Sequence, residues 1–312
     1  MEFDAEVLLC DISPIPQDDG SNPVVSIQYT EKYSKLMGIF RAVLVTKEYS
    51  ERILHLTKLL LLENAANYTV WQYRRDCIRS IKYDLEQELD FLDTFADDNP
   101  KNYQIWHHRR CVVELFDNAH RELAFINKIF ETDAKNYHAW AYRQWVVKKF
   151  KYWSDELACI DHLLYIDVRN NSAWNHRWYV VHNYLLEPST TTNENTIKVL
   201  NSELEYVFKS INQVKYNESA WNYLRGLINT HSELIFTALP LLKGINVSGD
   251  YDENHYYLCL LAHIFEKVGS TESLEECCEL YMKLLTIDST RAKFWNSKIN
   301  IVAKLLENTE TV

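Results

Sequence analysis

The sequence is poor in the residues that make tight turns. Its 312 residues include only 6 glycines and 6 prolines, whereas these two residue types together make up roughly 12% of an average protein. Sandwiches, barrels and dinucleotide-binding domains need many residues at positive or fixed φ. The composition therefore predicts an all-helical protein.

Signals for secretion and for membrane insertion are also missing. The first residues contain no signal-peptide pattern, and the longest purely aliphatic run, Leu59 to Leu62, is far shorter than a membrane span. The 7 cysteines form no Cys-x-x-Cys pair, which favours reduced, buried thiols. A net charge of −11 repels nucleic acid and anionic lipid. We therefore expect a cytoplasmic protein that neither binds nucleic acid nor inserts into a membrane.

What the chain does contain is a repeat marked by tryptophan. The segments NYTVWQYRR, NYQIWHHRR, NYHAWAYRQW, NNSAWNHRW and NESAWNYLR begin at Asn67, Asn102, Asn136, Asn170 and Asn217. The tryptophans that follow the first four of these asparagines by four residues, Trp71, Trp106, Trp140 and Trp174, are separated by 35, 34 and 34 residues. This period is typical of a solenoid unit of two helices. The sequence thus predicts six or seven helical hairpins, stacked into a superhelix with a concave surface.

The repeat is interrupted at two places. The motif tryptophan Trp221 follows Trp174 after 47 residues, and the polar run at 187–196 within this interval predicts a lengthened loop. A unit without tryptophan is expected near Tyr251 to Phe265. By domain, the sequence predicts an irregular arm over 1–23, one repeat domain over 24–306 and a frayed tail over 307–312.

Most of the repeated motif is expected to be structural. Each asparagine precedes a helix and can cap it. Each tryptophan is predicted to fill the core between repeats, and the arginine three residues later to pair with an acid or stack on a ring. These arginines are Arg74, Arg109, Arg143 and Arg177.

Familiar catalytic motifs are absent from the sequence. It has no glycine-rich phosphate loop, no Gly-x-Ser-x-Gly elbow and no His-Glu-x-x-His zinc helix. Of His107, His108 and Cys111, one histidine and the cysteine could share a helix face and bind a metal. The two histidines, however, occupy positions that hold Gln72, Tyr73, Ala141 and Tyr142 in other repeats. We therefore expect no metal site in this chain. Lys135 and, one repeat earlier, Lys101 directly precede predicted helix starts, where an anion is favoured.

The repeat core Asn-Tyr-x-x-Trp-x-x-Arg, above all DAKNYHAWAYRQWV from Asp133 to Val146, resembles the α subunit of protein prenyltransferases. The resemblance extends over roughly residues 24 to 300. The stretch from Tyr29 to Ser50 is similar to the subunit shared by farnesyltransferase and geranylgeranyltransferase type I. This family implies a right-handed superhelical crescent of helical hairpins around a β subunit that holds zinc, with magnesium as a further candidate cofactor.

The resemblance also implies a reaction and a set of site residues. The family transfers a C15 or C20 prenyl group from farnesyl or geranylgeranyl diphosphate to the cysteine of C-terminal CaaX sequences of proteins and peptides. Lys135 matches the family's diphosphate-binding lysine, and Tyr137 is expected to line the mouth of the prenyl diphosphate site. Tyr103 and His138 are predicted to approach the peptide. Asn170 matches a position near the same mouth, although capping is its stronger interpretation.

Two alternatives remain open at this point. A scaffold of the tetratricopeptide type would have the same period without any chemistry, but its Trp-x-x-Leu-Gly-x-x-Tyr motif is not what recurs here. The α subunit of the type II enzyme, which prenylates Rab proteins, is the other alternative.

Overall fold

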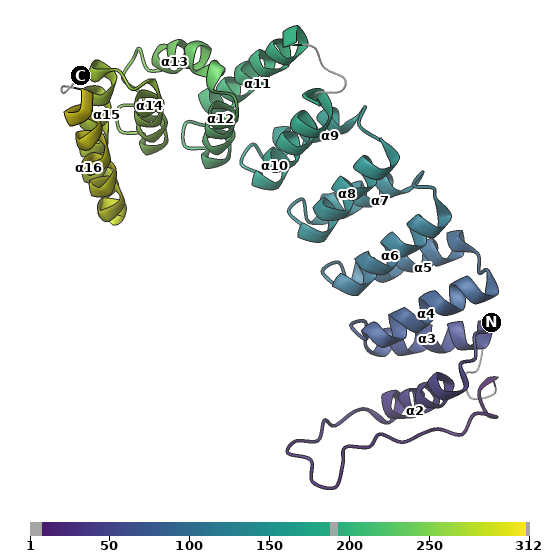
Figure 1. Ribbon diagram of the computed structural model, residues 1–312. Helices are drawn as coiled ribbons and strands as arrows, with labels where there is room; N and C mark the ends of the chain where they lie inside the picture. Colours follow the sequence, from purple (N-terminus) through teal and green to yellow (C-terminus); the bar gives the residue numbers. More distant parts are fainter. Residues whose placement is uncertain (1–7, 188–192, 310–312) are drawn as a thin grey trace. The chain divides into compact units, whose positions relative to one another are not determined.

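The computed structural model describes residues 8–187 and 193–309, and within them every regular element is a helix (Figure 1). The all-helical prediction is confirmed. The chain divides into two compact units, Met1–Lys151 and Tyr152–Val312, and each is built from consecutive helices that pair as hairpins.

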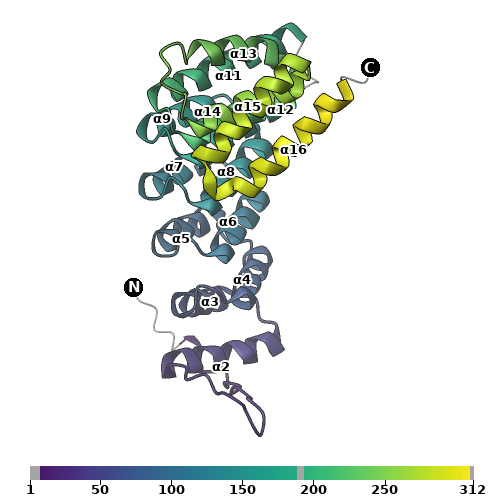
Figure 2. The same cartoon turned by 90° about the vertical axis from the view of Figure 1, so that its left-hand side faces the viewer.

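Among its described residues, the first unit contains the helix α2 (Glu31–Thr46) and three hairpins. The hairpins are α3 (Glu51–Glu63) with α4 (Tyr68–Ile81), α5 (Leu85–Asp98) with α6 (Tyr103–Phe116), and α7 (Glu122–Thr132) with α8 (Tyr137–Phe150). The second helices of neighbouring hairpins pack on one another, α4 on α6 and α6 on α8. Figure 2 shows α3, α5 and α7 in one layer and α4, α6 and α8 in the other.

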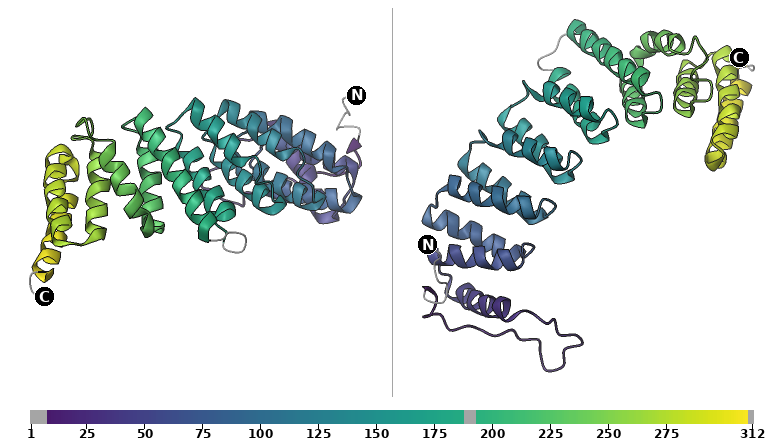
Figure 3. Two further views of the ribbon diagram at one scale, coloured as in Figure 1. Left: turned by 90° about the horizontal axis from the view of Figure 1, so that it is seen from above. Right: turned by 180° about the vertical axis from the view of Figure 1, so that it is seen from behind.

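The second unit continues the same plan (Figure 3). Its pairs are α9 (Glu156–Ile166) with α10 (Asn171–Val180), α11 (Asn193–Gln213) with α12 (Glu218–Thr230), α13 (Ile235–Gly244) with α14 (His255–Val268), and α15 (Thr271–Ile287) with α16 (Ala292–Thr309). A π-helical turn, η1 (Val181–Leu185), extends α10, and the short 3₁₀ turns η2 (Ser232–Leu234) and η3 (Ser289–Arg291) precede α13 and α16. In the described ranges the two units thus hold seven hairpins, in agreement with the expected six or seven.

The repeated asparagines cap the second helix in six of the seven described hairpins, from α4 to α14. Asn102, for example, accepts a hydrogen bond from the backbone nitrogen of Gln104 at 2.8 Å, and five further asparagines act in the same way: Asn67, Asn136, Asn170, Asn217 and Asn254. A cap satisfies backbone donors that the first turn leaves without a partner. The predicted capping role is confirmed.

The same asparagines also join one repeat to the next. The backbone carbonyl of Ala65 accepts from Trp71 Nε1 at 2.8 Å and from Asn102 Nδ2 of the next repeat at 2.9 Å. The carbonyl of Pro100 likewise accepts from Trp106 and Asn136. A carbonyl oxygen has two lone pairs, so one oxygen serves two repeats and sets their spacing.

Buried glutamates provide a second link between repeats. Glu88 on α5 accepts from Arg74 of the preceding hairpin at 2.7 and 2.6 Å and contacts His108 Nε2 of its own hairpin at 2.8 Å. Arg109, Glu122 and Tyr142 repeat this arrangement, as do Arg177, Glu203 and Tyr223. The structural role predicted for the tryptophans and arginines is confirmed, since Trp71 and Arg109 are almost fully buried.

The irregular regions differ in detail from the expectation. Residues 193–196 of the predicted loop form the first turn of α11, where Lys198 pairs with Glu194 at 2.7 Å, while 188–192 lie outside the described residues.

The unit expected near Tyr251 has α14 as its second helix. Leu258 takes the place of the motif tryptophan, four residues after the capping Asn254. Helix α16 continues to Thr309, beyond the start of the predicted tail at 307, and 310–312 lie outside the description.

The N-terminal segment packs against α2. Arg41 donates to the carbonyl of Ile15 at 2.8 Å, and Gly38 lies so close to Pro14 that an added Cβ would be 3.0 Å from the proline Cβ. Glycine at this position therefore permits the contact. Helix α2 begins at Glu31, and whether 1–23 acts as a separate arm and 24–306 as one domain stays a prediction.

Candidate functional site at the starts of α6 and α8

The sequence-predicted residues of the first unit gather around two helix starts. Tyr103 is the first residue of α6, Tyr137 and His138 are the first two residues of α8, and Lys135 lies in the turn before α8. Because α6 and α8 pack side by side, capping by Asn102 and Asn136 brings these side chains to the same end of the helical layer.

The aromatic side chains contact one another across the two helices. The ring of Tyr103 lies edge-on to that of His138 with centroids 4.3 Å apart, and the ring of Trp106 stacks on His138 at 6.3 Å. Tyr103 and Tyr137 are 70% and 72% exposed, so most of each phenol ring is available to a ligand. Two exposed tyrosines with a histidine held between them form a surface suited to an apolar or aromatic group.

Partial burial makes His138 a neutral side chain. Removal of the ring from water lowers the pKa of His138, although a hydrogen bond to the backbone of Lys101 opposes this shift. At neutral pH the imidazole therefore adds no charge to the aromatic surface. The neutral ring donates one hydrogen bond and accepts another, and its tautomer decides which nitrogen does which.

The two lysines of this region lie in equivalent turns. Lys135 is exposed, and its backbone nitrogen donates to Asp133 Oδ1 at 3.1 Å, which closes the turn before α8. Lys101 occupies the same position before α6, and its ammonium lies 3.7 Å from Asp133 Oδ2. Both lysines therefore directly precede the positive end of a helix dipole, where an anion is favoured.

Asn170, the remaining site candidate, belongs to the second unit. Its side-chain oxygen accepts hydrogen bonds from the backbone nitrogens of Ser172 and Ala173 at 3.0 and 3.3 Å, and the residue is 1% exposed. The structure thus gives it the capping role that the sequence favoured. Its contact with substrate stays a prediction.

The histidine and cysteine cluster on α6 divides into two separate environments. His108 is fully buried beside Glu88, whereas His107 Nε2 lies 3.7 Å from Cys111 Sγ near the surface. In the described part of the chain, no group of three or more His, Cys, Asp or Glu side chains is arranged to hold a metal ion.

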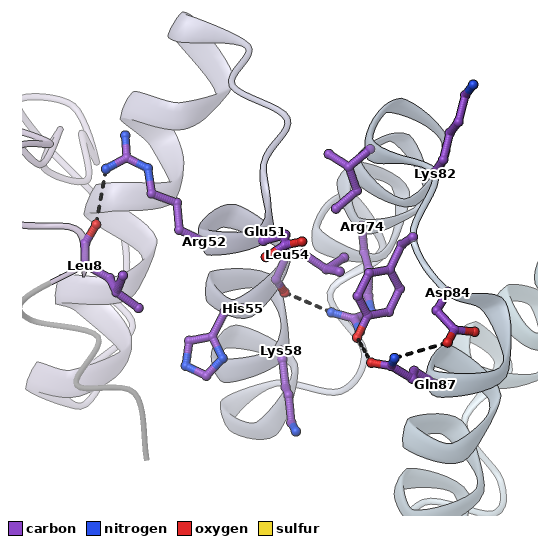
Figure 4. A pocket seen from close by; sticks show the side chains of 12 residues that line it. Leu8, Glu51, Arg52, Leu54, His55, Lys58, Arg74, Lys82, Asp84 and Gln87 are labelled. Carbon is purple, nitrogen blue, oxygen red and sulfur yellow. Dashed lines mark hydrogen bonds between the residues drawn. The ribbon is translucent and has the colours of Figure 1, made fainter. Parts of the chain in front are cut away.

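A cavity lies elsewhere in the first unit. It has a volume of about 700 Å³ and is lined by residues of α3, α4 and the start of α5, among them Arg52, His55, Lys58 and Arg74 (Figure 4). Two of its cations already have carboxylate partners, because Arg52 binds Glu48 and Arg74 binds Glu88. None of the predicted site residues lines this cavity.

The buried glutamates were missed by the sequence analysis. A signal for them exists, because a Glu-Leu pair recurs in the first helix of four hairpins. It lies in the first turn at Glu88, Glu122 and Glu156, and in the middle of the longer α11 at Glu203. The contact between His182 and His231, 49 residues apart, left no such signal, since it depends on how α12 packs against α10.

Comparison with known proteins identifies the repeat. The family model "Protein prenyltransferase alpha subunit repeat" matches residues 50–81, 85–116, 119–150, 153–184 and 200–231, which correspond to the hairpins from α3 to α12. The chain belongs to the family of protein prenyltransferase alpha subunits. The resemblance inferred from the tryptophan motif is thereby confirmed.

Individual relatives narrow the assignment within the family. The protein farnesyltransferase/geranylgeranyltransferase type-1 subunit alpha of Dictyostelium discoideum is 38% identical over 310 residues, which cover 95% of this chain and 93% of the relative. The protein of the same name from Schizosaccharomyces pombe is 46% identical over 110 residues, 35% of this chain and 37% of that protein. This prenyltransferase alpha subunit therefore resembles the shared type rather than a tetratricopeptide scaffold.

A solved structure agrees with this assignment. The chain matches one from the Candida albicans protein geranylgeranyltransferase-I complexed with GGPP, with a TM-score of 0.82 and 31% identity, over 94% of this chain and 98% of that chain. Among the described helices of our alpha subunit, none is both long enough and apolar enough to cross a membrane.

Proposed function

We propose that this chain is the α subunit of a cytoplasmic heterodimeric enzyme that prenylates proteins. The enzyme would transfer a C15 or C20 isoprenoid from farnesyl or geranylgeranyl diphosphate to the cysteine thiol of a C-terminal CaaX sequence. The observation that supports this most strongly is the 38% identity to the Dictyostelium farnesyltransferase/geranylgeranyltransferase type-1 subunit over 95% of the chain.

In this proposal a β subunit completes the active site. The α chain would curve around it as a right-handed crescent, and the β subunit would contribute the catalytic zinc, with magnesium as a further candidate. Zinc bound there would supply a thiolate from the substrate cysteine. The proposal assigns no metal ligand to the α subunit.

Lys135 is proposed to stabilise the leaving group. During transfer a carbon–sulfur bond forms at C1 of the prenyl chain while the carbon–oxygen bond to diphosphate breaks, and the diphosphate leaves with the bonding electrons. Negative charge therefore grows on the diphosphate in the transition state, where a fixed cation contributes most. The turn closed by Asp133 and the capped start of α8 hold Lys135 at a place favourable for an anion.

The aromatic surface beside Lys135, formed by Tyr103, Tyr137 and His138, is proposed to contact the prenyl chain and the peptide. Tyr137 would line the mouth of the prenyl diphosphate site, and Tyr103 and His138 would approach the peptide. The support is their mutual contact and the large exposed area of both tyrosines. Asn170 would act there chiefly as the cap that positions the start of α10.

The role of Lys135 can be tested by single-turnover kinetics on the reconstituted heterodimer. We expect Lys135→Ala to slow the transfer step about a hundredfold, because a lost charge-assisted contact raises the barrier by about 3 kcal/mol, while binding of the prenyl diphosphate changes less. Lys149→Ala is the matched control, since it removes the same charge from the opposite end of α8. An unchanged transfer rate in Lys135→Ala would refute the assignment.

The requirement for a partner has a separate test. The chain alone and the chain with candidate β subunits are assayed with CaaX peptides that differ in their last residue. Transfer only in the complex supports the proposal, whereas transfer by the isolated chain contradicts it. Transfer only to Rab proteins would indicate the type II subunit instead.

A further inference from the structure

Two histidines of the second unit face each other through their ring nitrogens. His182 Nε2 and His231 Nε2 are 3.3 Å apart, and the two rings lie 5.5 Å apart with an angle of 28° between their planes. His182 comes from the π-helical turn η1 and His231 is the C-cap of α12. Neighbouring hairpins thus contribute one imidazole each.

The other nitrogen of each ring is turned towards an oxygen. His182 Nδ1 lies 3.0 Å from the carbonyl oxygen of Trp178, which can only accept, so Nδ1 of His182 carries a proton. His231 Nδ1 lies 3.6 Å from Glu233 Oε1, which is too long for a hydrogen bond and leaves the tautomer of His231 open. If His231 carries its proton on Nε2, the pair shares one N–H···N hydrogen bond. If it carries the proton on Nδ1, both Nε2 atoms present lone pairs that a cation can bind.

The spacing suits a metal ion. Two imidazole nitrogens bound to one tetrahedral Zn²⁺, each at about 2.0–2.1 Å, are about 3.3–3.4 Å apart. A carbonyl or carboxylate that receives the second ring proton is the usual support of a metal-binding histidine. Burial lowers the pKa of His182, which keeps its imidazole in the neutral form that binds metals.

The surrounding structure holds His182 in place. The indole of Trp178 stacks on its ring with centroids 3.8 Å apart. Trp178 in turn packs against Gly226 of α12, where an added Cβ would lie 3.0 Å from the indole Cζ3. The bond from Leu186 N to the carbonyl of Val181, 2.9 Å long, closes the π-helical turn, and such turns are frequent at functional sites.

We propose that His182 and His231 chelate one divalent ion of the kind that prefers imidazole ligands, Zn²⁺, Ni²⁺ or Cu²⁺, through their Nε2 atoms. The described residues offer no third His, Cys, Asp or Glu to complete the group, so water fills the remaining positions. The bound ion links the end of α10 to the end of α12 and stabilises the second unit. This inference does not rest on the proposed transferase activity.

The test is a calorimetric titration of the full chain, prepared without a histidine tag and stripped of metal, with Zn²⁺ and with Ni²⁺. We expect one ion per chain, and affinity lowered about tenfold or more by His182→Gln and by His231→Gln. His120→Gln is the matched control, because His120 lies 3.6 Å from Glu86, the same spacing as His231 and Glu233. Affinity should fall as the pH is lowered, because protons compete for the imidazoles.

Further measurements guard against misfolded variants. Glu233→Gln changes a side chain that is 62% exposed and keeps both imidazoles, so it should weaken binding less than either histidine variant. Ni²⁺ should raise the Tm of the unaltered chain but not that of His231→Gln. Equal metal affinity in the unaltered chain and both histidine variants overturns the proposal. The proposal is also overturned if neither Zn²⁺ nor Ni²⁺ binds the unaltered chain, in which case the two rings share one N–H···N hydrogen bond.

Discussion

Two adjacent arginines on α6 illustrate how burial decides what a charge contributes. Arg109 is 1% exposed and donates to both oxygens of Glu122 at 2.6 and 2.8 Å, and its guanidinium stacks 3.5 Å from the Phe125 ring. Arg110, the next residue, pairs with Glu114 at 3.1 Å on the surface. Removal of one partner from a buried pair leaves the other charge without compensation, whereas water replaces the partner at the surface.

Arg109→Met should therefore lower the free energy of unfolding by about 3–5 kcal/mol, because Glu122 would remain buried with only Tyr142 beside it among the partners described here. Arg110→Met should change it by about 0.5 kcal/mol or less. Urea denaturation of both variants measures the difference. Equal losses in the two variants would contradict the structural role of the buried pair.

The capping asparagines act on whole helices. Asn102 caps α6 through its oxygen and, through its nitrogen, binds the Ala65 carbonyl that also accepts from Trp71. One side chain thus starts a helix and sets its distance from the preceding hairpin. Because Tyr103 follows directly, the cap also fixes where the proposed peptide contact begins.

Substitutions at Asn102 can separate these two functions. Asn102→Asp keeps the capping oxygen and loses the donor to Ala65, so it should lose only the part of the stability that comes from the link between hairpins. Asn102→Ala loses both and should be destabilised further by about 1 kcal/mol, the usual contribution of a cap. Chemical denaturation gives both values. Equal stability of the two variants would show that capping contributes nothing here.

Across the molecule, buried histidines couple stability to pH. Burial lowers the pKa of His108, His138, His182 and His263 below the ordinary value of 6.5. Below pH 6.5 the unfolded chain therefore binds more protons than the folded chain, and stability falls with acidification. Glu88 adds to the loss at lower pH: burial alone would raise its pKa, but Arg74 and His108 outweigh this and lower it.

We accordingly expect the urea midpoint to be nearly constant above pH 7 and to decrease as the pH falls below 6.5. His108→Gln should lower stability at every pH, yet flatten this decrease by up to about 1.4 kcal/mol per pH unit, the contribution of one proton. Denaturation curves at several pH values provide the measurement. A slope unchanged by the substitution would mean that His108 is protonated in the folded state.

The fold could be predicted from sequence because its information is local. The scarcity of glycine and proline, the period of the tryptophans and the asparagine before each second helix lie within single hairpins. Family resemblance then supplied Lys135 and its neighbours as candidates. The unit without tryptophan was predicted as well, and Leu258 of α14 confirms it. The extension of α11 into the predicted loop was not predicted, because it depends on contacts between hairpins that the motif does not encode.

By itself the sequence determined the helical class, the repeat and the family, since these follow from periodic patterns and caps that act over a few residues. Only the tertiary structure showed that Glu88 and Glu122 are buried between consecutive hairpins, that Tyr103 contacts His138, and that His182 meets His231. The physical reason is that such contacts join residues from separate helices, and their geometry is decided by packing and by the need to pair every buried charge.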